Sequence, residues 1–282
     1  MSARDLPTDE VRAIELLARV KAKFLAPPPR VDVAEWAAQY RHIAKGSERG
    51  RWRNERTPYL VEPMQCASSF SPYERVVLQF ATQLGKTEVL YNSLMQRIHT
   101  EPQDLMMVQP TLQDAQDHSG QRFLPTVQQT PVMAGLVATQ RSRDESSSWR
   151  ARSIQGGFAV FFAGANSASS LASKPIGMAV ADEVDKWPAD VDNQGPPLFS
   201  QRKLIIASTP TIKGASIVEA EYLASDRRQY HVPCPHCGES QVLVWGKQDD
   251  GVDHGYGLQW LKTPTGAARP ETAVYICRHC AA

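Results

Sequence analysis

Short apolar runs alternate with longer mixed stretches between residues 75 and 233, and this alternation restricts the fold more than any other feature. Helical stretches follow the first two runs, at 86–99 and about 112–129. Apolar strands separated by helical segments predict an α/β fold with a mostly parallel sheet and flanking crossover helices. Residues 139–153, rich in Arg and Ser, predict an exposed excursion. The apolar runs are 76–80, 105–109, 158–163, 176–181 and 204–208.

The composition is that of an ordinary globular protein. Of its 282 residues, 42% are hydrophobic and 22% are charged, and the formal net charge is +1. Binding to nucleic acid would therefore depend on local basic patches. No apolar run approaches the roughly 18–20 residues that a membrane span needs, and the N-terminus lacks the apolar core of a secretion signal. We expect a cytoplasmic protein without membrane association.

Gly85-Lys86-Thr87 stands between the strand predicted at 76–80 and the helix predicted at 86–99. A phosphate-binding loop ends in this way, but its pattern G-x-x-x-x-G-K-[ST] would begin with a glycine where this chain has Phe80. Backbone N–H groups, a helix N-terminus, a lysine and a hydroxyl are the parts that phosphate and Mg²⁺ require. We therefore predict a variant nucleotide-binding loop made of Thr82, Gln83, Leu84, Gly85, Lys86 and Thr87.

Two later strands deliver polar side chains to the same edge of the predicted sheet. The run 176–181 ends in Asp182 and Glu183, which are suited to holding Mg²⁺ and to orienting or deprotonating water. The run 204–208 ends in Ser208 and Thr209, at the edge where ligands collect in open parallel sheets. Alone, each would indicate a strand followed by a turn. Together with the Gly-Lys-Thr sequence, they indicate a nucleotide-hydrolysing site.

Four of the five cysteines form two C-x-x-C pairs near the C-terminus, Cys234/Cys237 and Cys277/Cys280. In a reducing compartment this arrangement favours metal binding over disulfides, and two such pairs complete a tetrahedral Cys₄ zinc site. A redox role is the alternative, but it would not require two pairs. We predict a small Cys₄ zinc-ribbon module.

Six segments follow one another along the chain: QLGKTE, MVQPT (107–111), GANSASSLASKP (164–175), ADEVDKWP (181–188), ASTPTIKG (207–214) and CPHCGE (234–239). Taken in this order, they resemble the large terminase subunit of tailed phages, in its lambda-like branch. The resemblance covers about residues 35–282 and implies a P-loop NTPase-type motor that uses ATP to move double-stranded DNA through a portal into a procapsid. It further implies a small terminase subunit as partner, a homo-oligomer when docked, and a location in the host cytoplasm.

The resemblance also implies a role for individual residues. Lys86 would contact the β- and γ-phosphates of ATP, Thr87 and Asp182 would hold Mg²⁺, and Glu183 would be the catalytic carboxylate.

Three more roles follow from the same likeness. Ser208 and Thr209 would couple hydrolysis to DNA movement, and Tyr59, in RWRNERTPYL (51–60), would stack on adenine.

The predicted organisation has three parts: a helical and linker region at 1–57, the P-loop ATPase domain at 58–232 and the zinc ribbon at 233–282. Two features depart from the family. The connection 186–203 is short, contains three prolines and lacks a good helix. The sequence therefore does not predict how the sheet packs around this connection. Family members also continue into a nuclease domain, so we expect no DNA cleavage by this chain.

Other readings remain open at this stage. The chain also suits a helicase-like ATPase without a capsid partner, or a non-enzymatic zinc-ribbon adaptor whose nucleotide fold is degenerate. The arginine-rich segment 46–57 is equally well explained as a solvated loop or as a phosphate or nucleotide contact. The cation that stabilises transition-state charge belongs either to a neighbouring subunit or to Arg75, Arg122, Arg152 or Lys174.

Overall fold

The computed structural model describes residues 12–17, 30–44, 46, 48–138, 148–167, 175–188, 203–246 and 254–282. The chain divides into two compact units, Met1–Ser225 and Asp226–Ala282, called here the first and the second unit.

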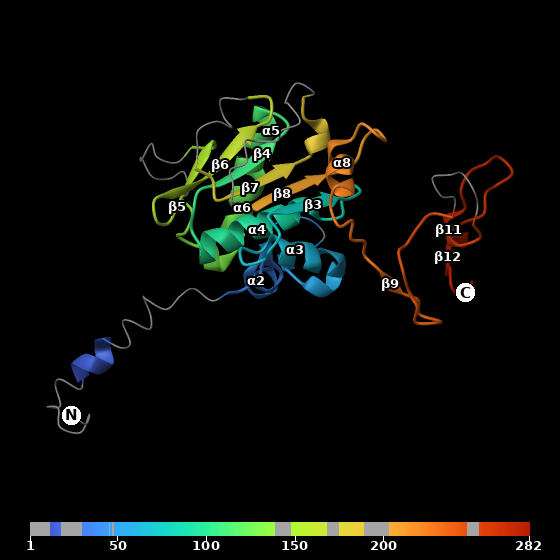
Figure 1. Ribbon diagram of the computed structural model, residues 1–282, viewed down its shortest axis with the longest axis horizontal. Helices are drawn as coiled ribbons and strands as arrows, with labels where there is room; N and C mark the ends of the chain where they lie inside the picture. The colour runs from blue at the N-terminus through green and yellow to red at the C-terminus, as the bar shows by residue number, and fades with distance from the viewer. Residues whose placement is uncertain are drawn as a thin grey trace. The chain divides into compact units, whose positions relative to one another are not determined.

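A six-stranded sheet forms the centre of the first unit, with the strand order β3-β8-β7-β4-β6-β5 (Figure 1). Every neighbouring pair is parallel except β5 and β6, which are antiparallel. The mostly parallel α/β sheet is thus confirmed, and each of the five predicted apolar runs forms a strand. The strands are β3 (Arg75–Gln79), β4 (Leu105–Gln109), β5 (Ala151–Ile154), β6 (Phe158–Gly164), β7 (Met178–Asp182) and β8 (Lys203–Ser208).

The edge strand β5 was missed by the sequence prediction. Its first residues belong to the stretch 139–153 that was expected to be an exposed excursion. Arg152 is in fact only 1% exposed, and its Nε donates to Ser119 Oγ at 3.0 Å. The prediction was wrong here because an edge strand pairs through its backbone, which an Arg- and Ser-rich composition does not reveal. Residues 139–147 lie outside the described residues.

Helices flank the sheet. The predicted helix at 86–99 is α4, and the predicted helix at 112–129 consists of α5, a π-helical turn (His118–Phe123) and α6. Of the N-terminal segment, residues 12–17 are helical and those around them lie outside the described residues. Besides the helical residues 12–17, the α-helices in the described part of the chain are α2 (Val33–Tyr40), α3 (Val61–Ala67), α4 (Lys86–Thr100), α5 (Leu112–Asp117), α6 (Leu124–Gln129) and α8 (Ile217–Leu223).

The strands separate two clusters of buried side chains. Alternate residues of a strand face opposite sides of the sheet, so Met107 and Val180 pack with residues of α4, whereas Val108 and Ala181 pack with Val218 of α8. Consequently, a residue at a strand's carboxyl end faces the same side of the sheet as the residue two positions before it.

The short connection between β7 and β8 does not disturb the sheet. The two strands pair directly, from Met178 opposite Lys203 to Asp182 opposite Ala207. Lys203, 6% exposed, donates through Nζ to the carbonyls of Cys66, in the last turn of α3, and of Tyr73, in the segment after it. Most of the connection itself, residues 189–202, lies outside the described residues.

The second unit contains two small antiparallel ladders. β9 (Val232–Pro233) pairs with β10 (Ser240–Gln241), and β11 (Gly257–Gln259) pairs with β12 (Val274–Ile276). Among the described residues of this unit, few apolar side chains are buried, so the unit needs a further source of stability. Among the described residues of the whole chain, no helix is long and apolar enough to cross a membrane.

Candidate functional site

The backbone of the phosphate loop explains why Phe80 is tolerated at its first position. Phe80 continues the geometry of β3, since its N–H donates to Ser208 O at 3.1 Å. The loop reaches positive φ only later, at Gln83 (63°) and Gly85 (81°). A Cβ on Gly85 would also lie 2.9 Å from Leu60 Cδ1. Glycine is therefore required at position 85, for both backbone and space, and not at position 80.

Gly85 is the N-cap of α4, so Lys86 begins that helix. Lys86 is only 6% exposed. Its Nζ lies 3.1 Å from Glu183 Oε1 and donates to Thr209 Oγ1 at 3.0 Å. The lysine thus links the phosphate loop to the carboxyl ends of both β7 and β8. The other loop residues, Thr82 and Leu84, are exposed.

Asp182 ends β7 beside the first turn of α4 and is 1% exposed. Its Oδ2 accepts hydrogen bonds from Thr87 Oγ1 at 3.2 Å and Gln109 Nε2 at 3.4 Å. Its Oδ1 is buried and has no hydrogen-bond partner among the residues that the structure describes. Burial raises the pKa of Asp182. A buried carboxylate oxygen without a partner, next to a hydroxyl, is an arrangement that fits a Mg²⁺ ligand pair.

Glu183 adopts a left-handed conformation, with φ of 52°. This conformation is costly for a residue other than glycine and is typical of functional sites. Besides Lys86, it pairs with Lys186 Nζ at 3.2 Å. Burial acts to raise the pKa of Glu183, but the hydrogen bonds and charges of Lys86 and Lys186 outweigh it and lower this pKa. The carboxylate is therefore ionised at neutral pH.

Ser208 and Thr209 face different surroundings. Thr209 contacts Lys86, as described above. Ser208 Oγ instead accepts a hydrogen bond from the backbone N–H of Asp185 at 3.2 Å. Asp185 in turn accepts from the N–H of Thr211 at 3.0 Å and from that of Val218, in α8, at 2.9 Å. Ser208 thus belongs to a chain of contacts between the Glu183 turn and α8.

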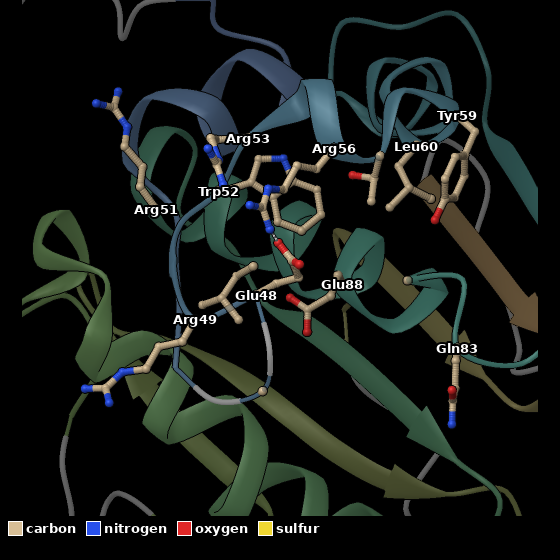
Figure 2. Close-up of a pocket in the computed structure, with 14 residues that line it drawn as sticks. Glu48, Arg49, Arg51, Trp52, Arg53, Arg56, Tyr59, Leu60, Gln83 and Glu88 are labelled. Atoms are coloured by element: carbon tan, nitrogen blue, oxygen red, sulfur yellow. Dashed lines mark ion pairs between the residues drawn. The ribbon is translucent and has the colours of Figure 1, made fainter.

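A cavity of about 630 Å³ adjoins the phosphate loop. Figure 2 shows the Arg56–Glu48 ion pair beside Glu88, with Tyr59 and Gln83 at the other side of the view. Tyr59 also packs edge-on against Phe80, with ring centroids 6.4 Å apart. The cavity is lined by Ile43, Gly46, Glu48, Arg49, Arg51, Trp52, Arg53, Arg56, Thr57, Tyr59, Leu60, Gln83, Gly85 and Glu88.

The sequence analysis missed one buried network beside this cavity. Arg41 is completely buried, and its Nη2 lies 2.7 Å from Glu88 Oε2 while its Nε donates to Asn92 Oδ1 at 3.0 Å. Burial lowers the pKa of Arg41, and the Glu88 carboxylate opposes this shift. The only signal in the sequence was the position of Glu88, directly after Gly-Lys-Thr.

A second missed pair joins α4 to the π-helical turn: Tyr91 Oη lies 2.9 Å from His118 Nδ1. Burial lowers the pKa of His118 to about 4, and the charge of Arg122 acts in the same direction. Nothing in the sequence spacing indicated this contact.

Three of the four candidate transition-state cations, Arg75, Arg122 and Arg152, are among the described residues of the first unit. Arg75 begins β3, at the end opposite the phosphate loop, and pairs with Glu221 Oε2 at 2.8 Å. Arg152 is buried against Ser119, and Lys174 lies outside the described residues. Among Arg75, Arg122 and Arg152, only the charge of Arg122 affects the pKa of Tyr91 in α4. The charge of Asp182 affects the same pKa.

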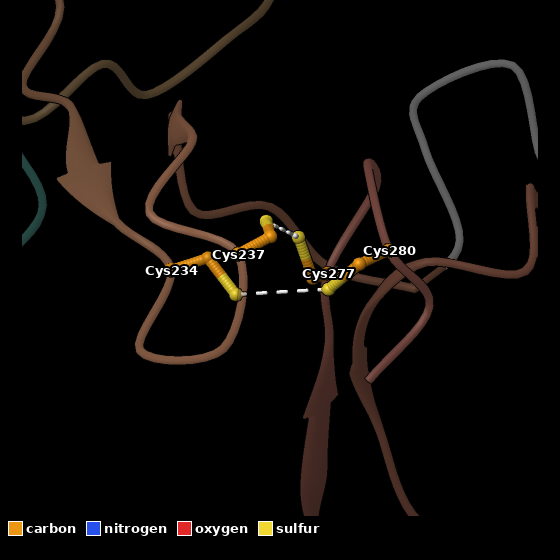
Figure 3. A group of neighbouring side chains, drawn as sticks. All are labelled: Cys234, Cys237, Cys277 and Cys280. Carbon is orange, nitrogen blue, oxygen red and sulfur yellow. Dashed lines mark hydrogen bonds between the residues drawn. The ribbon is translucent and has the colours of Figure 1, made fainter.

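The four paired cysteines of the second unit converge on one point (Figure 3). Their sulfur atoms all lie within 4.8 Å of one another, and the Cys234–Cys280 and Cys237–Cys277 Sγ distances are both 3.9 Å. A disulfide would need about 2.05 Å. Thiolates bound tetrahedrally at about 2.3 Å from zinc are separated by about 3.8 Å. The geometry fits a Cys₄ zinc site.

The electrostatics of the cluster also fit a cation. The thiols titrate together. Backbone hydrogen bonds from Cys280 and His279 lower the pKa of the Cys277 thiol to about 6. Although the Glu239 backbone lowers the pKa of the Cys237 thiol, desolvation and the neighbouring sulfurs outweigh it and raise this pKa to about 12. Thiolates this close repel one another, and a divalent cation relieves the repulsion.

Two similar turns hold the cysteine pairs. The backbone N–H groups of His236 and His279 each approach the preceding cysteine's sulfur at 3.4 Å. Gly238 has φ of 78° in the first turn, and Ala281 has φ of 57° at the corresponding place in the second. The histidines within the pairs are exposed and are not members of the cluster.

A model of the phage terminase large subunit gpA ATPase domain matches residues 46–282. The chain belongs to this family. The predicted resemblance to large terminase subunits is thereby confirmed.

Two curated relatives are terminase large subunits. The chain is 27% identical over 264 residues to the terminase large subunit of Enterobacteria phage P21, an alignment that covers 89% of this chain and 39% of the relative. It is 25% identical over 287 residues to the terminase large subunit of Escherichia phage lambda, covering 98% and 43%. The chain therefore spans about two fifths of the length of the curated relatives it matches.

The fold has a solved counterpart. The crystal structure of the HK97 bacteriophage large terminase superposes with a TM-score of 0.52 at 12% identity, covering 70% of this chain and 42% of that one. At this identity, the likeness concerns the fold.

Proposed function

We propose that this chain is the ATP-hydrolysing motor part of a DNA-packaging terminase and couples hydrolysis to translocation of double-stranded DNA into a procapsid. One observation carries the proposal. Side chains that the sequence keeps far apart, in the phosphate loop and at the ends of β7 and β8, converge on Lys86 and Asp182 at one edge of the sheet. This is the edge at which parallel sheets bind ligands.

Lys86 and the backbone of the loop Thr82–Lys86 would hold the phosphates of ATP, since Gly85 allows the chain to approach them closely. Thr87 and Asp182 would supply oxygen ligands for Mg²⁺, which, when bound, neutralises charge on the β- and γ-phosphates. The buried Asp182 Oδ1, without a hydrogen-bond partner among the described residues, supports this assignment.

Glu183 is our proposed catalytic carboxylate. Its lowered pKa keeps it ionised, as a group that orients water and accepts its proton must be. Lys86 bridges Glu183 and Thr209. A triphosphate would compete for the same ammonium, so we infer that binding of ATP loosens the Lys86–Glu183 pair and frees Glu183 for water.

The cavity beside the loop is the proposed site of the adenosine. Its volume lies in the range of about 300–1,000 Å³ that is usual for small-molecule pockets. Tyr59 would stack on adenine, and the adjacent Trp52 and Leu60 supply apolar surface. The arginines of the segment 46–57 line the same cavity, which favours a nucleotide contact over a purely solvated loop.

Movement would pass from the active site to DNA through the contacts of the Glu183 turn. Thr209 touches Lys86, and Ser208 binds the backbone of Asp185, which caps the start of α8. A change at Lys86 would therefore reach α8 through Thr209, its peptide neighbour Ser208 and the hydrogen bonds of Asp185. We propose double-stranded DNA, a small terminase subunit and a portal or procapsid as partners, and a homo-oligomer when docked. The second unit would bind one Zn²⁺.

The experiment is an ATPase assay with single-stranded DNA, with double-stranded DNA, and with double-stranded DNA plus procapsids that carry a portal. We expect procapsids to stimulate turnover most, and Lys86→Ala to abolish it. Stimulation by single strands alone would favour the helicase-like alternative. Failure of the unmodified protein to bind ATP with Mg²⁺ would favour the non-enzymatic adaptor.

A further inference from the structure

Gln109 has no role in the site proposed above, yet it lies at its centre. It is the last residue of β4, the strand that adjoins β7 on the side away from β8. The parallel register runs from Leu105 opposite Met178 to Val108 opposite Ala181. The next position on each strand brings Gln109 beside Asp182.

The alternation along both strands directs these two side chains to the same face. Met107 and Val180 pack into the cluster that includes α4, whereas Val108 and Ala181 face the other cluster. Gln109 and Asp182, one residue further on, are therefore on the α4 side. This is the face where Thr87 begins the helix.

The environment of Gln109 leaves its amide little freedom. The residue is 1% exposed, and its backbone carbonyl accepts a hydrogen bond from Ala165 N at 2.8 Å. Its Nε2 donates to Asp182 Oδ2 at 3.4 Å, the same oxygen that accepts from Thr87. Two donors on Oδ2 fix the plane of the carboxylate and leave Oδ1 as its open oxygen.

We propose that Gln109 is a positioning residue that orients Asp182 for a divalent cation. The inference rests on the proposed Mg²⁺-dependent function and adds a residue that touches neither metal nor nucleotide. Partners that hydrogen-bond a ligating carboxylate fix its orientation, and their loss typically costs about 10–100-fold in metal affinity. Gln109 would act in this way because no other described residue but Thr87 donates a side-chain hydrogen bond to Asp182.

A merely structural role makes a different prediction. If the amide only fills the space between β4 and β7, its replacement lowers stability without a selective effect on metal. Gln96, in α4, provides the matched control. It is also 1% exposed, and its Nε2 donates to the carbonyl of Val31 at 3.0 Å. Both Gln109→Met and Gln96→Met remove one buried amide of the same length.

The test measures Mn²⁺ binding directly, by the loss of the free-ion signal in electron paramagnetic resonance, with ADP present. Binding of a fluorescent ADP without metal and the melting temperature are measured on the same proteins. We expect Gln109→Met to weaken Mn²⁺ binding about 10–100-fold, with metal-free ADP binding unchanged. Gln96→Met should leave Mn²⁺ binding unchanged. If Gln109→Met does not fold, Gln109→Asn replaces it, because its shortened amide falls short of Asp182.

Equal Mn²⁺ affinity in Gln109→Met and the unmodified protein overturns the inference while the proposed function stands. Equal losses in the Gln109 and Gln96 variants overturn it too, since they indicate a general effect of destabilisation. Failure of the unmodified protein to bind Mn²⁺ with nucleotide overturns the proposed function itself and this role with it.

Discussion

Lys86 Nζ lies 3.1 Å from Glu183 Oε1, so the lysine of the phosphate loop is paired with the carboxylate proposed to act on water. Glu183 reaches this position through a left-handed backbone conformation at the end of β7. The pair makes the two ends of the proposed reaction, phosphate binding and water activation, depend on each other.

Glu183→Gln should bind ATP with Mg²⁺ normally and lose hydrolysis. Thr87 and Asp182 are unchanged in this variant, but the amide does not accept a proton, and a general base contributes typically about 10²–10⁴-fold. Steady-state turnover and equilibrium binding of ATP measure the two effects. Glu221→Gln, which breaks the pair with Arg75 at the opposite end of β3, is the control and should keep full activity. Turnover at the normal rate in Glu183→Gln would refute the assignment.

Gly85→Ala should abolish nucleotide binding. At φ of 81°, and with Leu60 Cδ1 2.9 Å from the new Cβ, alanine displaces the loop. Gly135→Ala is the control, since Gly135 has φ of 79° with open space around it. We expect each substitution to cost about 1 kcal/mol of folding stability for its backbone conformation, but only Gly85→Ala should lose ATP in a binding titration. Normal ATP affinity in Gly85→Ala would show that position 85 does not approach the phosphates.

These two variants illustrate what the sequence could predict. Five of the six strands of the central sheet followed from apolar runs, and the polar residues at the ends of β7 and β8 followed from the rule that ligands collect at the carboxyl edge. The sequence analysis predicted that the loop tolerates Phe80 at its first position. The structural reason is that the backbone reaches positive φ only at Gln83 and Gly85. Sequence spacing does not contain such angles.

The contacts that the sequence did not predict depend on which strands are neighbours in the sheet. Gln109 meets Asp182 because β4 adjoins β7, and β8 lies between β7 and β3. Neither relation follows from the order along the chain. The cavity, too, forms where the segment around Trp52 folds against Gly85 and Glu88. Contacts between distant segments are set by packing, so a pattern of residues alone did not reveal them.

His118 should make folding stability dependent on pH. Its pKa is lowered to about 4 in the folded protein by burial and by Arg122, from about 6.5 in an unfolded chain. The unfolded state therefore binds more protons between these values, and stability falls as the pH falls through this window. His118→Gln should reduce the difference in unfolding free energy between about pH 7 and about pH 5 by up to about 2 kcal/mol.

Denaturant titrations at the two pH values measure this effect. His42, whose Nδ1 contacts the carbonyl of Tyr40 in the same unit, provides the control through His42→Gln. Equal pH dependence in the unmodified protein and His118→Gln would show that His118 does not titrate across this window.

The second unit should contain one zinc ion per chain. Removing zinc, or Cys234→Ser, should unfold the unit Asp226–Ala282 and leave the sheet of the first unit folded, because small domains with little core depend on their metal. Elemental analysis gives the zinc content, and hydrogen exchange reports the two units separately. Cys66→Ser, in the first unit, should change neither. A protein without zinc whose four paired thiols all react freely in the folded state would refute the site.

The part of the chain that the structure describes should not support DNA cleavage. Two-metal cleavage needs carboxylates from several elements around sites about 3.5–4 Å apart. Among the described residues, the four cysteines are the one group of three or more His, Cys, Asp or Glu side chains close enough to hold a metal. Asp182 and Glu183 already have roles in the proposed ATP site. Incubation with supercoiled plasmid and Mg²⁺ or Mn²⁺ should therefore leave it intact. Nicking that co-purifies with the protein and persists in Asp182→Asn would reveal a second acidic site.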